Sequence, residues 1–183
     1  HQVVRRQRQM CIRDSYNADA QIFDHHQRSN PLRKDSQPYS SFGLVWEHYG
    51  RKYLNALNVP PDNIELIHTT FDTKYVLPID LLDNGAMEPS MAGPLSILTL
   101  PALLGSLKPV FDDTSTTADD DAFFTALPIA RSFIEAAIRN LAATVRAQSI
   151  VFEAIAKAGP SRILELPMGM PYRSALDLSL IHI

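Results

Sequence analysis

Apolar residues recur at spacings of three and four in the stretch YSSFGLVWEHYGRKYLNAL, which begins at Tyr39. This spacing predicts one face of a helix, because residues three and four apart lie on the same side of it. The positions are Phe42, Val45, Trp46, Tyr49, Tyr53, Leu54 and Leu57. A hydroxyl of Ser40 or Ser41 is expected to cap its start, and Pro60 and Pro61 to end it.

Two further helices follow from the same pattern. One is predicted from Asn63, capped by Asp62 or Asn63 and running toward a turn at residues 84–85. The other covers residues 122–158, the longest periodic block, with Pro128 in its first turns and Gly159 directly after it. The acidic run before this block suits a helix N-terminus, where negative charge is favoured.

Shorter apolar runs predict strands. In QIFDHHQRSNP, which begins at residue 21, Ile22 and Phe23 favour a strand that stops at Asp24, and the polar tail reads as a loop. SRILELP, residues 161–167, predicts a second short strand. The apolar residues 95–109 contain Pro and Gly, and predict either a strand or short helices in the core.

Composition excludes several classes of protein. The chain has 183 residues, 45% apolar and 20% charged, as expected for one soluble globular domain. No apolar run is long enough for a membrane span. Cys11 is the single cysteine, which excludes a disulfide framework and a thiolate zinc cluster and fits a reducing, cytoplasmic setting. The net charge of −3 argues against a strongly basic nucleic-acid surface, but not against an enzyme that handles phosphate through metal ions.

The two ends of the chain differ from the rest. The first 13 residues contain Arg5, Arg6, Arg8 and Arg13 and no acid. They could form a basic arm or a targeting segment. We instead expect residues 1–14, and residues 179–183 at the other end, to be translated read-through sequence rather than native protein.

Two groups of residues carry candidate chemistry. The first is Asp24, His25 and His26, and the second is Asp80 with Asp83. Imidazole and carboxylate are the ligands of manganese, iron or zinc. At an extended strand end the two histidines point to opposite sides. One would then face the metals while the other reaches a substrate phosphate or holds the loop, and Asp24 would fix a ring tautomer.

Asp80 and Asp83 are three residues apart, which places both on one side of a helical turn. A carboxylate there could bridge two ions, and a two-metal clamp polarises a phosphoryl oxygen and makes hydroxide from water. The structural alternatives are a surface loop for the histidines and simple turn chemistry for the acids beside Asn84 and Gly85. His48 and His68 are predicted to be structural, and Trp46 to lie in the core. The chain contains no P-loop, dinucleotide fingerprint or serine-hydrolase motif.

Five landmarks occur in order along residues 16–178: FDHHQR, PYSSFGLVWEHYG, PIDLLDNG, FFTALPIARSFIEAAI and RILELPMGMPYRSAL. Together they resemble the melanocyte-proliferating-gene family, which is related to the DHH phosphoesterases. The resemblance implies an α/β fold, a DHH-phosphoesterase-like sheet flanked by helices. It also implies divalent-metal phosphoesterase chemistry, with manganese as the expected ion, and eukaryotic members act as exonucleases on RNA.

The resemblance also implies roles for the candidate residues. Asp24, His25 and His26 match the DHH motif, with His25 as a metal ligand and with His26 and Asp24 as catalytic residues, His26 lying nearer the scissile phosphate. Asp83 matches the later acidic ligand position, and Asp80 is a further candidate ligand. The serine pair at residues 40–41 is expected to cap a helix near the site.

One departure from the family changes the expectation. Members begin with a segment of the form H-N-G-x-F-H-x-D-E and a strand that ends in an aspartate, and residues 1–20 match neither. We therefore expect a fragment whose sheet is incomplete at its N-terminus. Residues 15–110 would be a partial metal-binding domain and residues 111–178 the helical, C-terminal part of the same protein.

The leading hypothesis is that the full-length protein is a divalent-metal-dependent phosphodiesterase, a 3′–5′ exonuclease whose partner is RNA or another nucleic acid, while this chain is an inactive fragment. One alternative is a noncatalytic α/β interaction module. The other is a hydrolase of small phosphoesters or pyrophosphate. No membrane partner is expected, and the oligomeric state is left open.

Overall fold

The computed structural model describes residues 17, 22–25, 31–87, 93, 97–159 and 163–180, with side chains up to residue 177. Both predicted read-through ends lie outside these residues, except for residues 179–180. The elements in chain order are α2 (Ser41–Ala56), α3 (Pro61–Phe71), the π-helix η1 (Asp72–Val76), α4 (Leu77–Asp83), α5 (Leu100–Gly105), α6 (Ala118–Ala158) and α7 (Arg173–Leu180).

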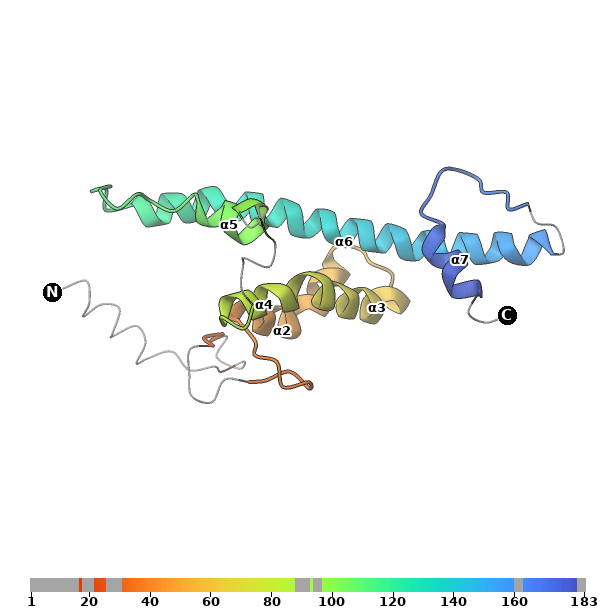
Figure 1. Ribbon diagram of the computed structural model, residues 1–183, viewed down its shortest axis with the longest axis horizontal. Helices are drawn as coiled ribbons and strands as arrows, with labels where there is room; N and C mark the ends of the chain where they lie inside the picture. The colour runs from red at the N-terminus through yellow and green to blue at the C-terminus, as the bar shows by residue number, and fades with distance from the viewer. Residues whose placement is uncertain are drawn as a thin grey trace.

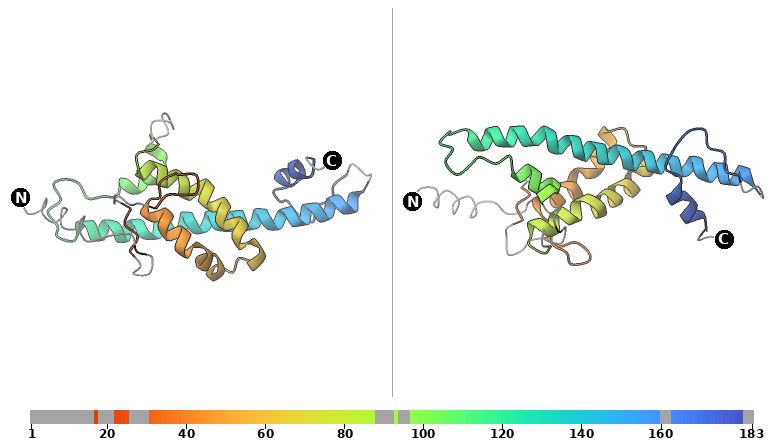
Figure 2. Two further views of the ribbon diagram at one scale, coloured as in Figure 1. Left: turned by 90° about the horizontal axis from the view of Figure 1, so that it is seen from below. Right: turned by 45° about the horizontal axis from the view of Figure 1, so that its top comes forward.

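The helices form two layers. The long helix α6 is one layer, and α2, α3, η1 and α4 form the other, which packs against the middle of α6 mainly through α3 (Figure 1). Helix α6 extends past this second layer at both ends in every view (Figure 2). Helix α5 contacts α6 toward one of those ends and α7 contacts it toward the other.

The predicted α/β sheet is wrong for the described part of the chain. There the only extended pairings are two isolated antiparallel bridges, Asn17 with Ile22 and Leu32 with Pro38. Residues 23–25 have no regular secondary structure, so Asp24 and His25 do not end a strand. Residues 163–166 also lack a strand partner among the described residues. A short apolar run gives no information about a partner, and a strand is stable only when one pairs with it.

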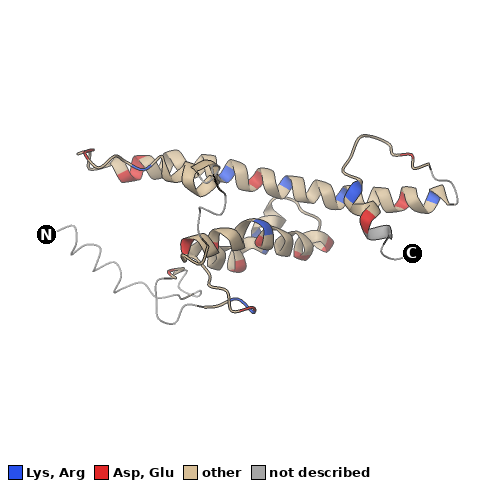
Figure 3. Cartoon of the chain, in the orientation of Figure 1, with Lys and Arg blue, Asp and Glu red and all other residues tan. Residues whose placement is uncertain are grey.

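The helices predicted from periodicity are confirmed, although α2 ends at Ala56, before the two prolines expected to end it, and α6 begins at Ala118 rather than at residue 122. Helix α2 begins after Ser40, whose Oγ accepts a hydrogen bond from the amide of Phe42 at 3.2 Å. Helix α6 contains Pro128 and ends at Ala158, and Gly159 directly after it has a positive φ of 54°, which favours glycine. The acidic run lies in the first turn of α6, at the end of this helix that extends beyond the other helices (Figure 3). The segment 95–109 contains the short helix α5, as one of the two alternatives predicted, but no residue of α5 is buried, so its predicted place in the core is wrong.

The helix predicted from Asn63 begins earlier, at Pro61. Proline suits the first helical position, because its missing N–H would have no partner there anyway. Pro60 stands at the cap with no side-chain hydrogen bond, so the predicted capping by Asp62 or Asn63 is wrong. The helix continues through η1 and α4, and the predicted turn follows at Gly85, with φ 66°.

The core lies where α2 and α3 meet α6. Trp46 is buried there as predicted, and the ring of His68 stacks on it with centroids 5.1 Å apart. The other buried members of this core are Leu54, Val59, Ile67, Phe71, Val76, Ile138 and Ala142. Only the middle of α6 is covered in this way, since several apolar residues of its first turns remain exposed: Phe123, Phe124, Leu127 and Phe133. None of the helices in the described regions has the length and apolar character that crossing a bilayer requires.

One polar contact joins the two layers and gives a first prediction. Tyr53 Oη donates to Glu135 Oε1 at 3.0 Å, linking α2 to α6. Tyr53→Phe keeps the ring and removes this bond, so we expect the free energy of unfolding to fall by about 1 kcal/mol. The matched control is Tyr75→Phe on the exposed side of η1, with an expected change within about 0.5 kcal/mol. Urea denaturation measures both, and equal changes would contradict the assignment.

Candidate metal centre

Two of the predicted metal ligands meet in the structure. His25 comes from the segment before α2, and Asp83 is the last residue of α4. His25 Nε2 lies 3.1 Å from Asp83 Oδ2. The His25 side chain is 8% exposed, whereas that of Asp83 is 52% exposed. The pair therefore has a buried imidazole whose outer nitrogen faces a carboxylate open to solvent.

Ser41 holds the other side of the His25 ring. The amide of Ser41 donates to Nδ1 at 3.1 Å, and Ser41 Oγ lies 3.0 Å from the same nitrogen. Ser41 is the first residue of α2, where an amide has no acceptor within the helix. The imidazole supplies that acceptor. As a result, the start of α2 fixes the ring and directs Nε2 toward Asp83.

Asp80 has a different place. It is fully buried, and its Oδ1 accepts from Ser40 Oγ at 2.6 Å and from the Gly43 amide at 3.1 Å. Its Oδ2 accepts from Arg33 Nη2 at 2.7 Å. The helical spacing predicted for the two acids is confirmed, but one is buried and the other is exposed. The structure therefore brings Asp83, and not Asp80, to His25.

Arg33 is the centre of the buried polar network. Its guanidinium binds both carboxylate oxygens of Asp72, the first residue of η1, as well as Asp80. It also lies over the ring of Tyr39, with Cζ 4.4 Å from the centroid. Burial opposes the charge of Arg33, but the two carboxylates outweigh it and raise the pKa of Arg33 above its ordinary value. Burial likewise raises the pKa of Tyr39, and the positive charge of Arg33 opposes that rise.

Asn84 adds a further support at the end of α4. Its Nδ2 donates to the carbonyl oxygens of Tyr39 at 3.1 Å and Asp80 at 2.8 Å. These bonds join the turn after α4 to the segment that leads into α2. The end of α4, and with it Asp83, is thereby held beside the start of α2 and His25.

The two remaining predicted site residues are Asp24 and His26. Asp24 precedes His25 and is half-buried. His26 lies outside the described residues, so its contact with a substrate phosphate stays a prediction. The sequence did not indicate Arg33, Asp72 or the role of Gly43, because no spacing pattern links them to the site.

The His25 and Asp83 pair fits a metal ion as two of its ligands. Two ligand atoms each about 2.0–2.2 Å from one ion are about 3 Å apart when they bind at neighbouring positions. The observed separation of 3.1 Å matches this. No group of three or more His, Cys, Asp or Glu side chains suited to a metal occurs within the described part of the chain. An ion here would therefore need additional ligands.

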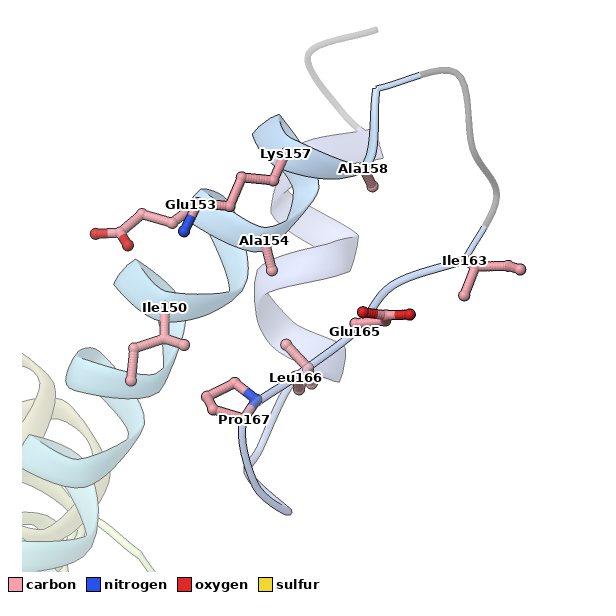
Figure 4. A pocket seen from close by; sticks show the side chains of 9 residues that line it. All are labelled: Ile150, Glu153, Ala154, Lys157, Ala158, Ile163, Glu165, Leu166 and Pro167. Atoms are coloured by element: carbon pink, nitrogen blue, oxygen red, sulfur yellow. The ribbon is translucent and has the colours of Figure 1, made fainter.

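A cavity of about 730 Å³ lies elsewhere, between α6 and residues 163–167 (Figure 4). Its charged lining residues are Glu153 and Lys157 from α6 and Glu165 from the extended segment. It shares no residue with the His25 and Asp83 pair. The remaining lining residues are all apolar: Ile150, Ala154, Ala158, Ile163, Leu166 and Pro167. The cavity therefore adds no group to the candidate metal centre.

Comparison with known proteins identifies relatives over most of the chain. It is 27% identical over 174 residues to MYG1 protein C694.04c of Schizosaccharomyces pombe, covering 84% of this chain and 52% of the relative. It is 28% identical over 172 residues to MYG1 exonuclease of Bos taurus, covering 84% of this chain and 45% of the relative. The chain thus spans about half the length of these curated relatives. No solved structure matches it.

The family itself follows from a longer match. The MYG1 exonuclease family model, described as Uncharacterised protein family (UPF0160), matches residues 10–179. This confirms the resemblance that the five sequence landmarks indicated. The match covers nearly the whole chain, including the segments that carry His25 and Asp83. The chain therefore belongs to the MYG1 family.

Proposed function

We propose that the whole protein to which this chain belongs is a divalent-metal-dependent phosphodiesterase, an exonuclease acting on RNA, and that His25 and Asp83 are two of its metal ligands. The observation that carries the proposal is the 3.1 Å approach of His25 Nε2 to Asp83 Oδ2 from distant parts of the chain. The relative from Bos taurus is named an exonuclease, which supports the reaction class.

Each residue of the pair would contribute one ligand atom. His25 would bind through Nε2 and Asp83 through Oδ2, a nitrogen and oxygen set that suits manganese, iron or zinc. When bound, the ion supplies Lewis-acid chemistry toward a phosphodiester. His25 is held by Ser41 and Asp83 by the end of α4, so the protein sets the positions of both side chains before an ion arrives.

Asp80 is a support rather than a ligand in this proposal. Its oxygens accept hydrogen bonds from Arg33, Ser40 and Gly43. If the Asp80 carboxylate turned toward an ion instead, these buried donors would lose their acceptor, which costs free energy. Asp24 and His26 keep the roles that the family resemblance implies, next to His25 in the chain.

A nuclease assay on the whole protein tests the proposal. We expect EDTA to abolish digestion of single-stranded RNA and added manganese to restore it. His25→Ala and Asp83→Ala should each lower the rate by about 100-fold or more, because each removes a ligand. Asp62→Ala, an exposed acid on α3, is the matched control and should retain full rate.

Two outcomes would contradict the proposal. Digestion that survives chelation would exclude metal-dependent catalysis. Full activity in Asp83→Ala would exclude the pair as a ligand set. Metal-dependent cleavage of small phosphoesters with no cleavage of RNA would keep the metal centre and replace the substrate class.

A further inference from the structure

The contacts of His25 fix which ring nitrogen carries hydrogen. A backbone amide can only donate, so the Ser41 amide at 3.1 Å requires a lone pair on Nδ1. The ring hydrogen is then on Nε2, which faces Asp83 Oδ2 at 3.1 Å. His25 is therefore held in the tautomer whose Nε2 is a donor and not a metal ligand.

Metal binding through Nε2 requires the opposite tautomer. A ligating nitrogen needs its lone pair, so the hydrogen of a neutral imidazole must then be on Nδ1. An Nδ1–H group cannot bond to the Ser41 amide, because both groups are donors. Since His25 is buried, its Nδ1–H needs an acceptor from the protein.

We propose that Ser41 is a positioning residue: its hydroxyl oxygen accepts the hydrogen bond from the Nδ1–H group of His25, which allows Nε2 to bind the ion. This inference rests on the metal centre of the proposed function. Ser41 Oγ lies 3.0 Å from Nδ1, and a hydroxyl can either donate or accept. On binding, one hydrogen leaves Nε2 and one is gained at Nδ1, with the net charge of the ring unchanged. The Nδ1–H group then donates to Ser41 Oγ.

The two adjacent serines have separate roles. Ser40 Oγ accepts from the Phe42 amide, which caps α2, and donates to Asp80 in the buried network. Ser41 Oγ faces His25 instead. Capping alone therefore explains Ser40, whereas the Ser41 hydroxyl is placed for the histidine.

Nitrogen NMR of the histidine rings and zinc titration of the 183-residue chain test the inference, with diamagnetic Zn²⁺ as the probe. The His25 signals are those absent from His25→Gln. In wild type we expect the Nε2–H tautomer without metal and the Nδ1–H tautomer with zinc. Ser41→Ala should keep the metal-free tautomer, because the backbone amide remains, and should bind zinc about 10–100-fold more weakly. Ser41→Thr keeps a hydroxyl and should restore binding.

The possible outcomes distinguish a failure of the proposed role of Ser41 from a failure of the proposed metal centre. If wild type and Ser41→Ala bind zinc equally and show the same tautomer change, the role of Ser41 is overturned and the metal centre stands. If zinc leaves the His25 signals of wild type unchanged, both are overturned. Unchanged thermal unfolding of Ser41→Ala shows that its weaker binding is not a loss of fold.

Discussion

Replacing Asp80 by alanine is expected to lower the free energy of unfolding by about 3–5 kcal/mol, because it removes one of the two carboxylates that pair with the buried guanidinium of Arg33. The carboxylate is fully buried and accepts three hydrogen bonds. Its removal leaves the Ser40 hydroxyl and the Gly43 amide without this acceptor. Arg33 would keep Asp72 but lose its second carboxylate.

Asp83→Ala is the matched control for Asp80→Ala, since both acids lie on α4. Its side chain is half exposed, so we expect a change of less than about 1 kcal/mol. Urea denaturation with a common slope for all variants provides the comparison. Equal destabilisation by the two substitutions would show that the network around Asp80 does not support the fold as described.

Replacing Gly43 by alanine is expected to cost about 2–3 kcal/mol, although alanine is usually the better helix former. A Cβ at this position would lie 2.1 Å from Asp80 Oδ2. The obstructing atom belongs to a fully buried carboxylate fixed by hydrogen bonds, so it cannot move aside as a flexible side chain would. Helix α2 would have to move away from α4.

Two comparisons test this explanation of Gly43. Gly105→Ala in α5 meets no atom within 4 Å, so it should be neutral or stabilising by up to about 1 kcal/mol. In the Asp80→Ala background, Gly43→Ala should lose most of its cost, because the obstructing carboxylate is gone. Additive effects in the double variant would show that the cost of Gly43→Ala has another cause.

The network around Asp80 and the candidate metal centre share one helix. Asp80 anchors α4 from within, and Asp83, three residues later, presents its carboxylate to His25. The start of α2 contacts both sites: the Ser40 hydroxyl donates to Asp80, and the Ser41 amide donates to His25. Buried polar contacts that stabilise the fold therefore also set the distance between the two proposed ligands.

The sequence predicted those parts of the fold that depend on local pattern. The spacing of Phe42, Trp46 and Tyr53 indicated α2, and the long periodic block indicated α6. The sheet was predicted from apolar runs such as Ile22–Phe23 and from family resemblance, and it is wrong for the described residues. Such runs also suit irregular segments that pack on helices, and pattern alone cannot show which partner they meet.

The candidate site was predictable only in part, for a similar reason. The family motifs indicated His25 and Asp83, which the structure brings together. The three-residue spacing grouped Asp80 with Asp83, although burial separates the two side chains. Arg33 meets Asp72 and Asp80 across 39 and 47 residues, contacts that arise from helix packing and leave no spacing signal.

Manganese binding measured by calorimetry on the 183-residue chain tests the central claim most directly. We predict saturable binding of one ion by wild type, with loss of that binding in both His25→Ala and Asp83→Ala. Asp112→Ala, an exposed acid between α5 and α6, should bind like wild type. The absence of saturable binding in wild type, or unchanged binding in both ligand variants, would contradict the assignment of His25 and Asp83 as a metal centre.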